Sequence, residues 1–276
     1  MKNNKLLACP YIVWMILFTI IPLGIVVYYA LTDSMTGQFT LANLTAIGSY
    51  LPIFLRSIWL SLFASLICLV IGYPVAYFIA QCKPLTQRFL EMLIMLPMCM
   101  SFLLRTLAWV GMLEDTGILN TFLQNIGLHP LPLIRTNGAV ILGMVYNYLP
   151  YMILPLYTVI MKIDNRLVEA ALDLGCTPMQ AFTKVVIHEI MPGIISGALM
   201  AFTMSLDDFV ISYFVTGSSF ITLPVEIYNY TKKPIQPKIY ALFTLMFIVI
   251  LVLMVVMNLL QAKSEKNRQQ PRRARA

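Results

Sequence analysis

Six long apolar runs determine what this chain can fold into. They cover residues 6–31, 53–80, 89–113, 138–161, 192–216 and 239–261. Each run is long enough to cross a bilayer as a helix, which takes about 20 residues. Only 11% of the 276 residues are charged, whereas soluble domains average about 25%. The runs therefore predict an all-α membrane protein with six transmembrane helices in a single domain spanning residues 1–276.

The distribution of lysine and arginine predicts the orientation of these helices. If the N-terminus is cytosolic, the cytosolic segments hold thirteen of these residues and the opposite segments hold four. Positive charge accumulates on the cytosolic side, so both termini are predicted there, together with the loop 162–191 and the basic tail 262–276. The net charge of +7 then indicates a tail facing anionic lipid or water rather than nucleic acid, because no basic patch is interleaved with aromatic residues.

Motifs for catalysis and metal binding are missing from the sequence. The chain has two histidines and no Cys-x-x-Cys pair, so we expect no metal, no cofactor and no catalytic residues. The phosphate-binding pattern Gly-x-x-x-x-Gly-Lys is also absent, so the chain is not expected to hydrolyse nucleotide by itself. An ion-driven secondary carrier is an alternative, although such carriers often contain repeated halves and no convincing repeat relates the first and last three runs.

The loop 162–191 carries the most specific pattern. Asp164 is placed to cap a helix, and Gly175 stands where a left-handed residue would end it. One apolar face recurs at helical spacing, made by Leu167, Ala170, Ala171 and Leu174. Thr177-Pro178-Met179-Gln180 then predicts a second helix start. An amphipathic helix lying on the membrane is the alternative, but the small alanines favour docking against protein.

Within this loop, Glu169-Ala170-Ala171 followed by Gly175 and a short apolar run resembles the coupling motif of the membrane-spanning subunits of ATP-binding-cassette importers. His188 stands where that family usually has proline. The resemblance implies a type I importer permease in a bacterial inner (plasma) membrane, with Glu169, Ala170, Ala171 and Gly175 contacting a separate ATPase. The implied partners are a second homologous permease subunit, two cytosolic ABC ATPase subunits and an extracellular solute-binding protein.

Further motifs extend the resemblance over nearly the whole chain, most of all to the permease subunits of spermidine/putrescine importers. These motifs are Arg105–Trp109, Gly117–Asn120, Val145–Pro150, Leu154–Tyr157, Met191–Ile194 and Ser205–Phe209. The resemblance implies a translocation path for polyamines. The shorter motifs also occur in permeases for iron, thiamine, sulfate and phosphonates, so those solutes are alternatives.

Three ionisable residues interrupt the apolar runs at a similar predicted depth: Arg105, Asp207 and Asp208. Charges inside a span are costly and suggest function or pairing, so one aspartate is predicted to form an intramembrane ion pair with Arg105. A path for a polycation would use carboxylates and aromatic faces. The candidate lining residues are Asp207, Asp208, Trp109, Tyr146, Tyr148 and Tyr213. Alternatively, the aspartates satisfy helix ends and the aromatic side chains only pack.

Overall fold

The computed structural model describes residues 9–32, 38–39, 48, 50–217 and 220–232, with isolated positions between 240 and 259. This part is helical apart from its connections and one isolated bridge between Thr32 and Phe39. The chain divides into two compact units, residues 1–54 with 226–253 and residues 55–225 with 254–276. The sixth predicted span, 239–261, lies mostly outside the described residues, and the tail 262–276 lies wholly outside them.

The first unit contains the N-terminal helical run. Its elements are α2 (Cys9–Met15), the π-helix η1 (Ile16–Ile20) and α3 (Ile21–Ala30). The π turn directly precedes Pro22, whose missing N–H disturbs the regular helical ladder. The run Pro10–Ala30 is long and apolar enough to cross a membrane, in agreement with the first predicted span. The same unit contains most of α14 (Leu223–Thr231), where the hydroxyls of Tyr50 and Tyr230 lie 3.0 Å apart.

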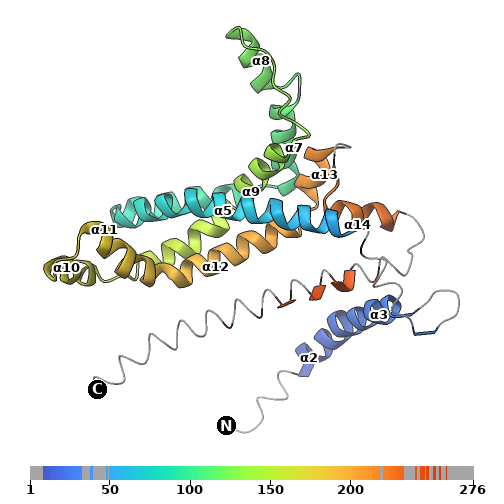
Figure 1. Ribbon diagram of the computed structural model, residues 1–276, viewed down its shortest axis with the longest axis horizontal. Coiled ribbons are helices and arrows are strands. Elements are labelled where there is room, and N and C mark those ends of the chain that lie inside the picture. Colours follow the sequence, from blue (N-terminus) through green and yellow to red (C-terminus); the bar gives the residue numbers. More distant parts are fainter. Residues whose placement is uncertain are drawn as a thin grey trace. The chain divides into compact units, whose positions relative to one another are not determined.

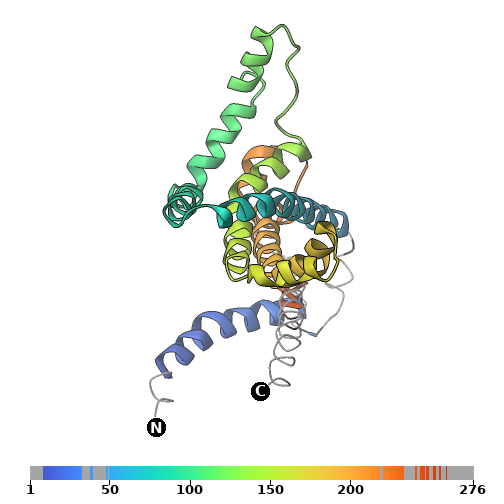
Figure 2. The same cartoon turned by 90° about the vertical axis from the view of Figure 1, so that its left-hand side faces the viewer.

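The second unit is a bundle built around three long helices, with shorter helices at its ends. Its elements are α5 (Leu51–Gln81), α6 (Pro84–Met95), the 3-10 helix η3 (Leu96–Cys99), α7 (Phe102–Leu113), α8 (Ile118–Asn125), α9 (Asn137–Ile160), α10 (Asn165–Asp173), α11 (Pro178–Ala181), the π-helix η4 (Phe182–Val186), α12 (Ile187–Leu206) and α13 (Val210–Thr216). Figure 1 shows α10 and α11 at one end of α5, α9 and α12, with α13 at the other end. In both Figure 1 and Figure 2, α7 and α8 project away from this bundle.

Small residues allow α9 and α12 to pack closely along their length. A Cβ atom added at Gly197 would lie 2.8 Å from the Met152 Sδ, and one at Gly193 would lie 3.1 Å from the Pro155 carbonyl oxygen. Met152 and Leu156 are fully buried at this contact. Interiors packed to this density have no space for an added methyl group, so the two glycines set the separation of the helices.

The connection between α8 and α9 is held by one buried side chain. The Nδ2 of Asn120 donates hydrogen bonds to the carbonyl oxygens of Leu131 (3.0 Å) and Glu114 (3.3 Å). Its Oδ1 accepts one from the Leu131 backbone N–H at 2.9 Å. Asn120 is completely buried, so its side chain links the segments before and after α8 from the protein interior.

The second and fourth predicted spans, 53–80 and 138–161, correspond to α5 and α9 within one or two residues. In the described residues, four helices are long and apolar enough to cross a membrane: Pro10–Ala30, Leu51–Gln81, Asn137–Ile160 and Pro178–Leu206. A bent pair, Pro84–Cys99 with Phe102–Asn125, makes a fifth candidate.

The third predicted span, 89–113, is not one straight helix. Its two halves meet at 87°, with Met100 and Ser101 in extended backbone conformations between them. Pro97 lies just before this break and cannot donate a backbone hydrogen bond, which weakens the helix at that point.

The fifth predicted span, 192–216, also differs from the structure. The helix begins earlier, at Pro178, and ends at Leu206. Asp207, Asp208 and Phe209 then break the helix before α13 begins. The side chain of Asp208 accepts hydrogen bonds from the backbone N–H groups of Ile211 and Ser212, so it competes with helix continuation.

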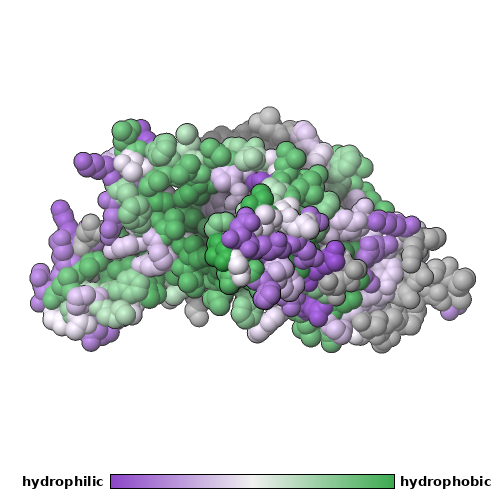
Figure 3. Space-filling model, turned by 90° about the horizontal axis from the view of Figure 1, so that it is seen from above, coloured by the Kyte–Doolittle hydropathy of each residue, from purple (hydrophilic) through white to green (hydrophobic). Residues whose placement is uncertain are grey.

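Apolar side chains cover much of the outer surface. Figure 3 shows broad hydrophobic areas on one face of the molecule. On α5, for example, Leu66 is 54% exposed and Val70 is 66% exposed. A water-soluble monomer rarely exposes such extensive apolar surface, so these faces suit contact with lipid or with other membrane subunits.

Candidate functional site

The helix and turn predicted around Gly175 are confirmed. The Asp164 carboxylate accepts a hydrogen bond from the Arg166 backbone N–H at 3.0 Å and caps the start of α10. Gly175 has φ +84°, the left-handed conformation that favours glycine. The N–H of Gly175 donates to the Leu172 carbonyl, and the N–H of Cys176 donates to the Ala171 carbonyl. This pair of bonds is a Schellman motif, which ends the helix in a sharp turn.

The second helix start in this segment is confirmed as well. The Thr177 Oγ1 accepts a hydrogen bond from the Gln180 N–H at 3.3 Å, and the Gln180 Oε1 accepts one from the Thr177 N–H at 3.1 Å. This reciprocal capping box fixes the start of α11, with Pro178 at its first position. From there, helical structure continues through η4 into α12. The turn is therefore connected rigidly to the long helix that leads to Asp208.

The residues of the coupling motif lie on the accessible surface of α10. Glu169 and Ala170 are exposed, and Ala171 is half-buried. Glu169 also lines a groove of about 690 Å³ together with residues at the ends of α5 and α9, among them Tyr77 and Met161. Two apolar side chains beside the motif face solvent, with Leu174 86% exposed and Met179 70% exposed.

At the opposite end of the bundle, Asp208 is held in a buried pocket. Only 4% of the residue is exposed. Its Oδ1 accepts hydrogen bonds from the Tyr148 hydroxyl (3.0 Å) and the Ile211 N–H (3.4 Å). Its Oδ2 accepts from the Ser212 N–H at 3.1 Å and from the Ser212 hydroxyl at 3.5 Å. The carboxylate thus accepts hydrogen bonds from N–H groups in the first turn of α13. This is the alternative given above, in which an aspartate satisfies a helix end.

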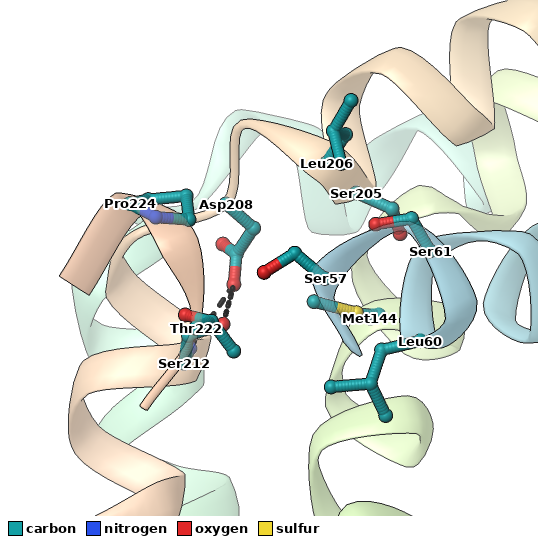
Figure 4. Close-up of a pocket in the computed structure, with 10 residues that line it drawn as sticks. All are labelled: Ser57, Leu60, Ser61, Met144, Ser205, Leu206, Asp208, Ser212, Thr222 and Pro224. Atoms are coloured by element: carbon teal, nitrogen blue, oxygen red, sulfur yellow. Dashed lines mark hydrogen bonds between the residues drawn. The ribbon is translucent and has the colours of Figure 1, made fainter. Parts of the chain in front are cut away.

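Hydroxyl groups surround this carboxylate, as Figure 4 shows. Ser57 and Ser61 come from α5, Ser205 from the end of α12, and Thr222 from the segment before α14. None of these hydroxyl residues was predicted from the sequence. The spacing of Ser57 and Ser61 places them on one face of a helix and could have indicated a polar patch, but the partners from α12 and α13 are visible only in the fold.

The two aspartates have different environments, as expected for adjacent positions at a helix end. Asp207 is exposed and follows directly after the last residue of α12, whereas Asp208 is buried. Of the two predicted path carboxylates, Asp207 is therefore the one a solute could reach in this conformation.

The predicted ion pair between Arg105 and an aspartate is not formed in the described structure. Arg105 is 9% exposed, and its Nε and Nη1 have no hydrogen-bond partner there. Its guanidinium instead lies over the Phe102 ring, with 5.5 Å between the Cζ and the ring centroid. The prediction assumed continuous helices, in which Arg105 and the two aspartates would lie at a similar depth in the membrane. The break at Met100–Ser101 and the end of α12 at Leu206 change these positions.

The aromatic residues predicted to line the translocation path make separate contacts. Trp109 and Tyr146 form a T-shaped pair with ring centroids 5.2 Å apart, and both are half-buried. The ring centroids of Tyr213 and Phe209 lie 5.1 Å apart in the segment that follows Asp207. Tyr148 is only 7% exposed and is hydrogen-bonded to Asp208, so both of these side chains are largely buried away from solvent.

Two solved structures share the fold of this chain. A bacterial ABC transporter that imports the acidic polysaccharide alginate contains a chain with a TM-score of 0.69, 19% sequence identity and coverage of 95% of this chain and 96% of its own. The alginate transporter in complex with an alginate-bound periplasmic protein gives a TM-score of 0.61, at 19% identity and with 94% and 93% coverage. The fold is therefore that of a type I ABC importer permease.

Residues 69–269 match the family described as binding-protein-dependent transport system inner membrane component, and the chain belongs to this family. The spermidine/putrescine transport system permease protein PotB of Haemophilus influenzae is 35% identical over 228 residues, which cover 79% of each chain. PotB of Escherichia coli K12 is 35% identical over 214 residues, covering 74% of this chain and 78% of the relative. The protein is thus a multi-pass inner-membrane permease subunit of an ABC importer and is not itself an enzyme.

Proposed function

We propose that this subunit forms part of the translocation path of a polyamine importer. The observation that supports this substrate class is the 35% identity to permeases named for spermidine and putrescine, over about four-fifths of both chains. The complete transporter would contain a second homologous permease, two cytosolic ABC ATPase subunits and an extracellular solute-binding protein. In this arrangement both termini face the cytosol, and residues 239–261 supply a sixth span.

The segment from α10 to α11 is proposed to couple this subunit to the ATPase. It lies at the end of the bundle opposite α13, which fits a cytosolic position. Leu174 and Met179 expose apolar surface beside Glu169, and a protein groove would remove that surface from water. Because α11 continues through η4 into α12, a displacement of α10 by the closing ATPase pair would move the helix that ends at Leu206, just before Asp207.

The proposed contacts with the polyamine are made by Asp207 and by aromatic faces. An ammonium group gains from a carboxylate and from cation–π contact. Asp207 is exposed beside the Phe209–Tyr213 pair, and the half-buried Trp109–Tyr146 pair offers a second aromatic surface. Asp208 and Tyr148 would reach a solute only after a rearrangement of the break between α12 and α13.

Uptake of radiolabelled spermidine and putrescine tests the substrate class. Cells lacking this gene should lose uptake and regain it with the wild-type chain. The D207N variant should raise the concentration needed for half-maximal polyamine uptake while leaving assembly with the ATPase intact. Restored uptake of sulfate, thiamine, iron or a phosphonate, with no polyamine uptake, would assign a different solute. Uptake that fails when an ion gradient is dissipated with ATP intact would point to a secondary carrier instead.

A further inference from the structure

The pocket beside Asp208 gathers oxygen atoms within an otherwise apolar bundle. Six of its lining residues carry a hydroxyl or a carboxylate: Ser57, Ser61, Ser205, Asp208, Ser212 and Thr222. They come from α5, the end of α12, the break that follows it, α13 and the segment before α14. In Figure 4 these side chains project into the space between the helices, with Ser57 directed toward Asp208. A polar surface assembled from so many separate elements indicates a binding site rather than one local turn.

Three hydroxyl oxygens in this pocket have no hydrogen-bond partner among the residues that the structure describes. They are the Oγ atoms of Ser61 and Ser205 and the Oγ1 of Thr222. All three residues are at most 2% exposed. Burying a hydroxyl without a partner is unfavourable, and native proteins rarely leave such groups together. A ligand that is coordinated by several oxygen atoms at once would give these hydroxyls an interaction partner.

The charge of the pocket selects a cation. The Asp208 carboxylate is buried and forms no ion pair with a lysine or arginine in the described part of the chain. Helix α12 ends at the same place, and the C-terminal end of a helix carries partial negative charge. Both features stabilise positive charge in the pocket. A single carboxylate is neutralised by one monovalent ion, whereas a divalent ion would leave an excess positive charge in a low-dielectric site.

We propose that this pocket binds one sodium ion per copy of this chain. The charged and hydroxyl donors of the pocket are oxygen atoms, which hard cations prefer, and the Met144 thioether is the one sulfur in the lining. The side chains leave no space for a water molecule, so the site favours a small dehydrated ion over potassium or ammonium. Discontinuous membrane helices provide sodium sites in other classes of transporter by the same physical means, with unwound backbone and helix ends facing the ion. The ion would join α5, α12 and α13.

Thermal unfolding of the purified complete transporter tests this site without solute or ATP. Samples in NaCl, KCl and choline chloride at equal ionic strength should differ, with a Tm that rises and saturates only with sodium. The S61A/S205A variant should lose this sodium-dependent rise. In choline chloride the same variant should be at least as stable as wild type, because the removed hydroxyls have no partner there.

The S65A variant is the matched control. Ser65 lies one turn further along α5, and its hydroxyl bonds to the Ala198 carbonyl at 3.2 Å outside the pocket. Its sodium response should equal that of wild type. Binding of radioactive sodium to the same preparations should be lost in D208N and in S61A/S205A. Equal Tm values in all three salts, the same rise with potassium, or full sodium binding by S61A/S205A would each overturn the proposal. None of these readouts depends on the identity of the transported solute.

Discussion

The hydroxyl of Tyr148 on α9 donates a 3.0 Å hydrogen bond to the Oδ1 of Asp208, which lies 60 residues later in the chain. The same carboxylate accepts hydrogen bonds from the backbone N–H groups of Ile211 and Ser212 in the first turn of α13. The Asp208 side chain therefore pairs with backbone N–H groups at the break after α12 and links this break to α9. Movement of this break requires the Tyr148–Asp208 bond to open or to move with it.

Replacing Tyr148 with phenylalanine removes this bond and leaves the ring in place. A hydrogen bond to a charged group contributes about 1.5–3 kcal/mol, so we expect Y148F to lower stability by an amount in that range. Thermal unfolding of the purified transporter measures the loss. Tyr151→Phe is the control, because Tyr151 is half-buried on the same helix and makes no side-chain hydrogen bond within the described residues. Equal Tm values for Y148F and wild type would contradict the role of the bond.

Gly175→Ala should weaken the coupling segment. An L-residue in the left-handed conformation costs about 1–2 kcal/mol, and Gly175 has φ +84° with open space around its Cα. We expect less ATPase to co-purify with the variant, together with slower uptake.

Gly127→Ala controls for backbone strain alone. Gly127 has φ +83° and equally open surroundings, but it lies in the connection between α8 and α9. It should carry the same conformational cost while retaining the ATPase. If both variants lost the ATPase to the same extent, the contact assigned to the Gly175 turn would be wrong.

Gly197→Ala should separate α9 from α12. The added Cβ would lie 2.8 Å from the Met152 Sδ and 3.0 Å from the Met152 carbonyl oxygen, and the backbone cannot yield as the side chain can. Overpacking of this kind typically costs about 1–3 kcal/mol. Gly111→Ala on α7 meets no atom within 4 Å and should be neutral or stabilising, since alanine favours helix. The two Tm shifts are predicted to have opposite signs or to differ clearly in size.

Asn120→Ala should open the connection between α8 and α9. The variant loses three hydrogen bonds, each of which typically contributes about 0.5–1.5 kcal/mol. Limited proteolysis should then cut between residues 114 and 131 faster than in wild type. Asn125→Ala, at the exposed end of α8, provides the comparison. Unchanged cleavage of the Asn120 variant would show that other contacts hold the connection.

The coupling segment could be predicted almost residue by residue, because its signals are local. Asp164 and Thr177 cap the helices that follow them, and Gly175 takes the left-handed conformation assigned to it. Each of these effects depends on backbone groups within three or four residues, so an unaligned sequence contains all the needed information. The long apolar helices α5 and α9 were predictable for a similar reason, since length and composition alone make them membrane spans.

The breaks in the third and fifth spans were not predictable from apolar content. Pro97 and Asp208 are single residues inside long apolar runs, and whether such a residue kinks, bends or ends a helix depends on which neighbouring groups satisfy the freed backbone. The different environments of Asp207 and Asp208 followed from one of these breaks, and so did the separation of Arg105 from both carboxylates.

The sequence by itself determined that the chain crosses a membrane several times, how its positive charge is distributed between the apolar runs, and where the short helices of the loop 162–191 begin and end. Hydrophobic length, charge bias and capping are properties of neighbouring residues and need no knowledge of the fold. Only the tertiary structure decided that Asp208 and the hydroxyls of Ser61, Ser205 and Thr222 meet in one buried pocket, and that Tyr148 bonds to Asp208. These groups come from separate helices, and the packing of those helices places them together.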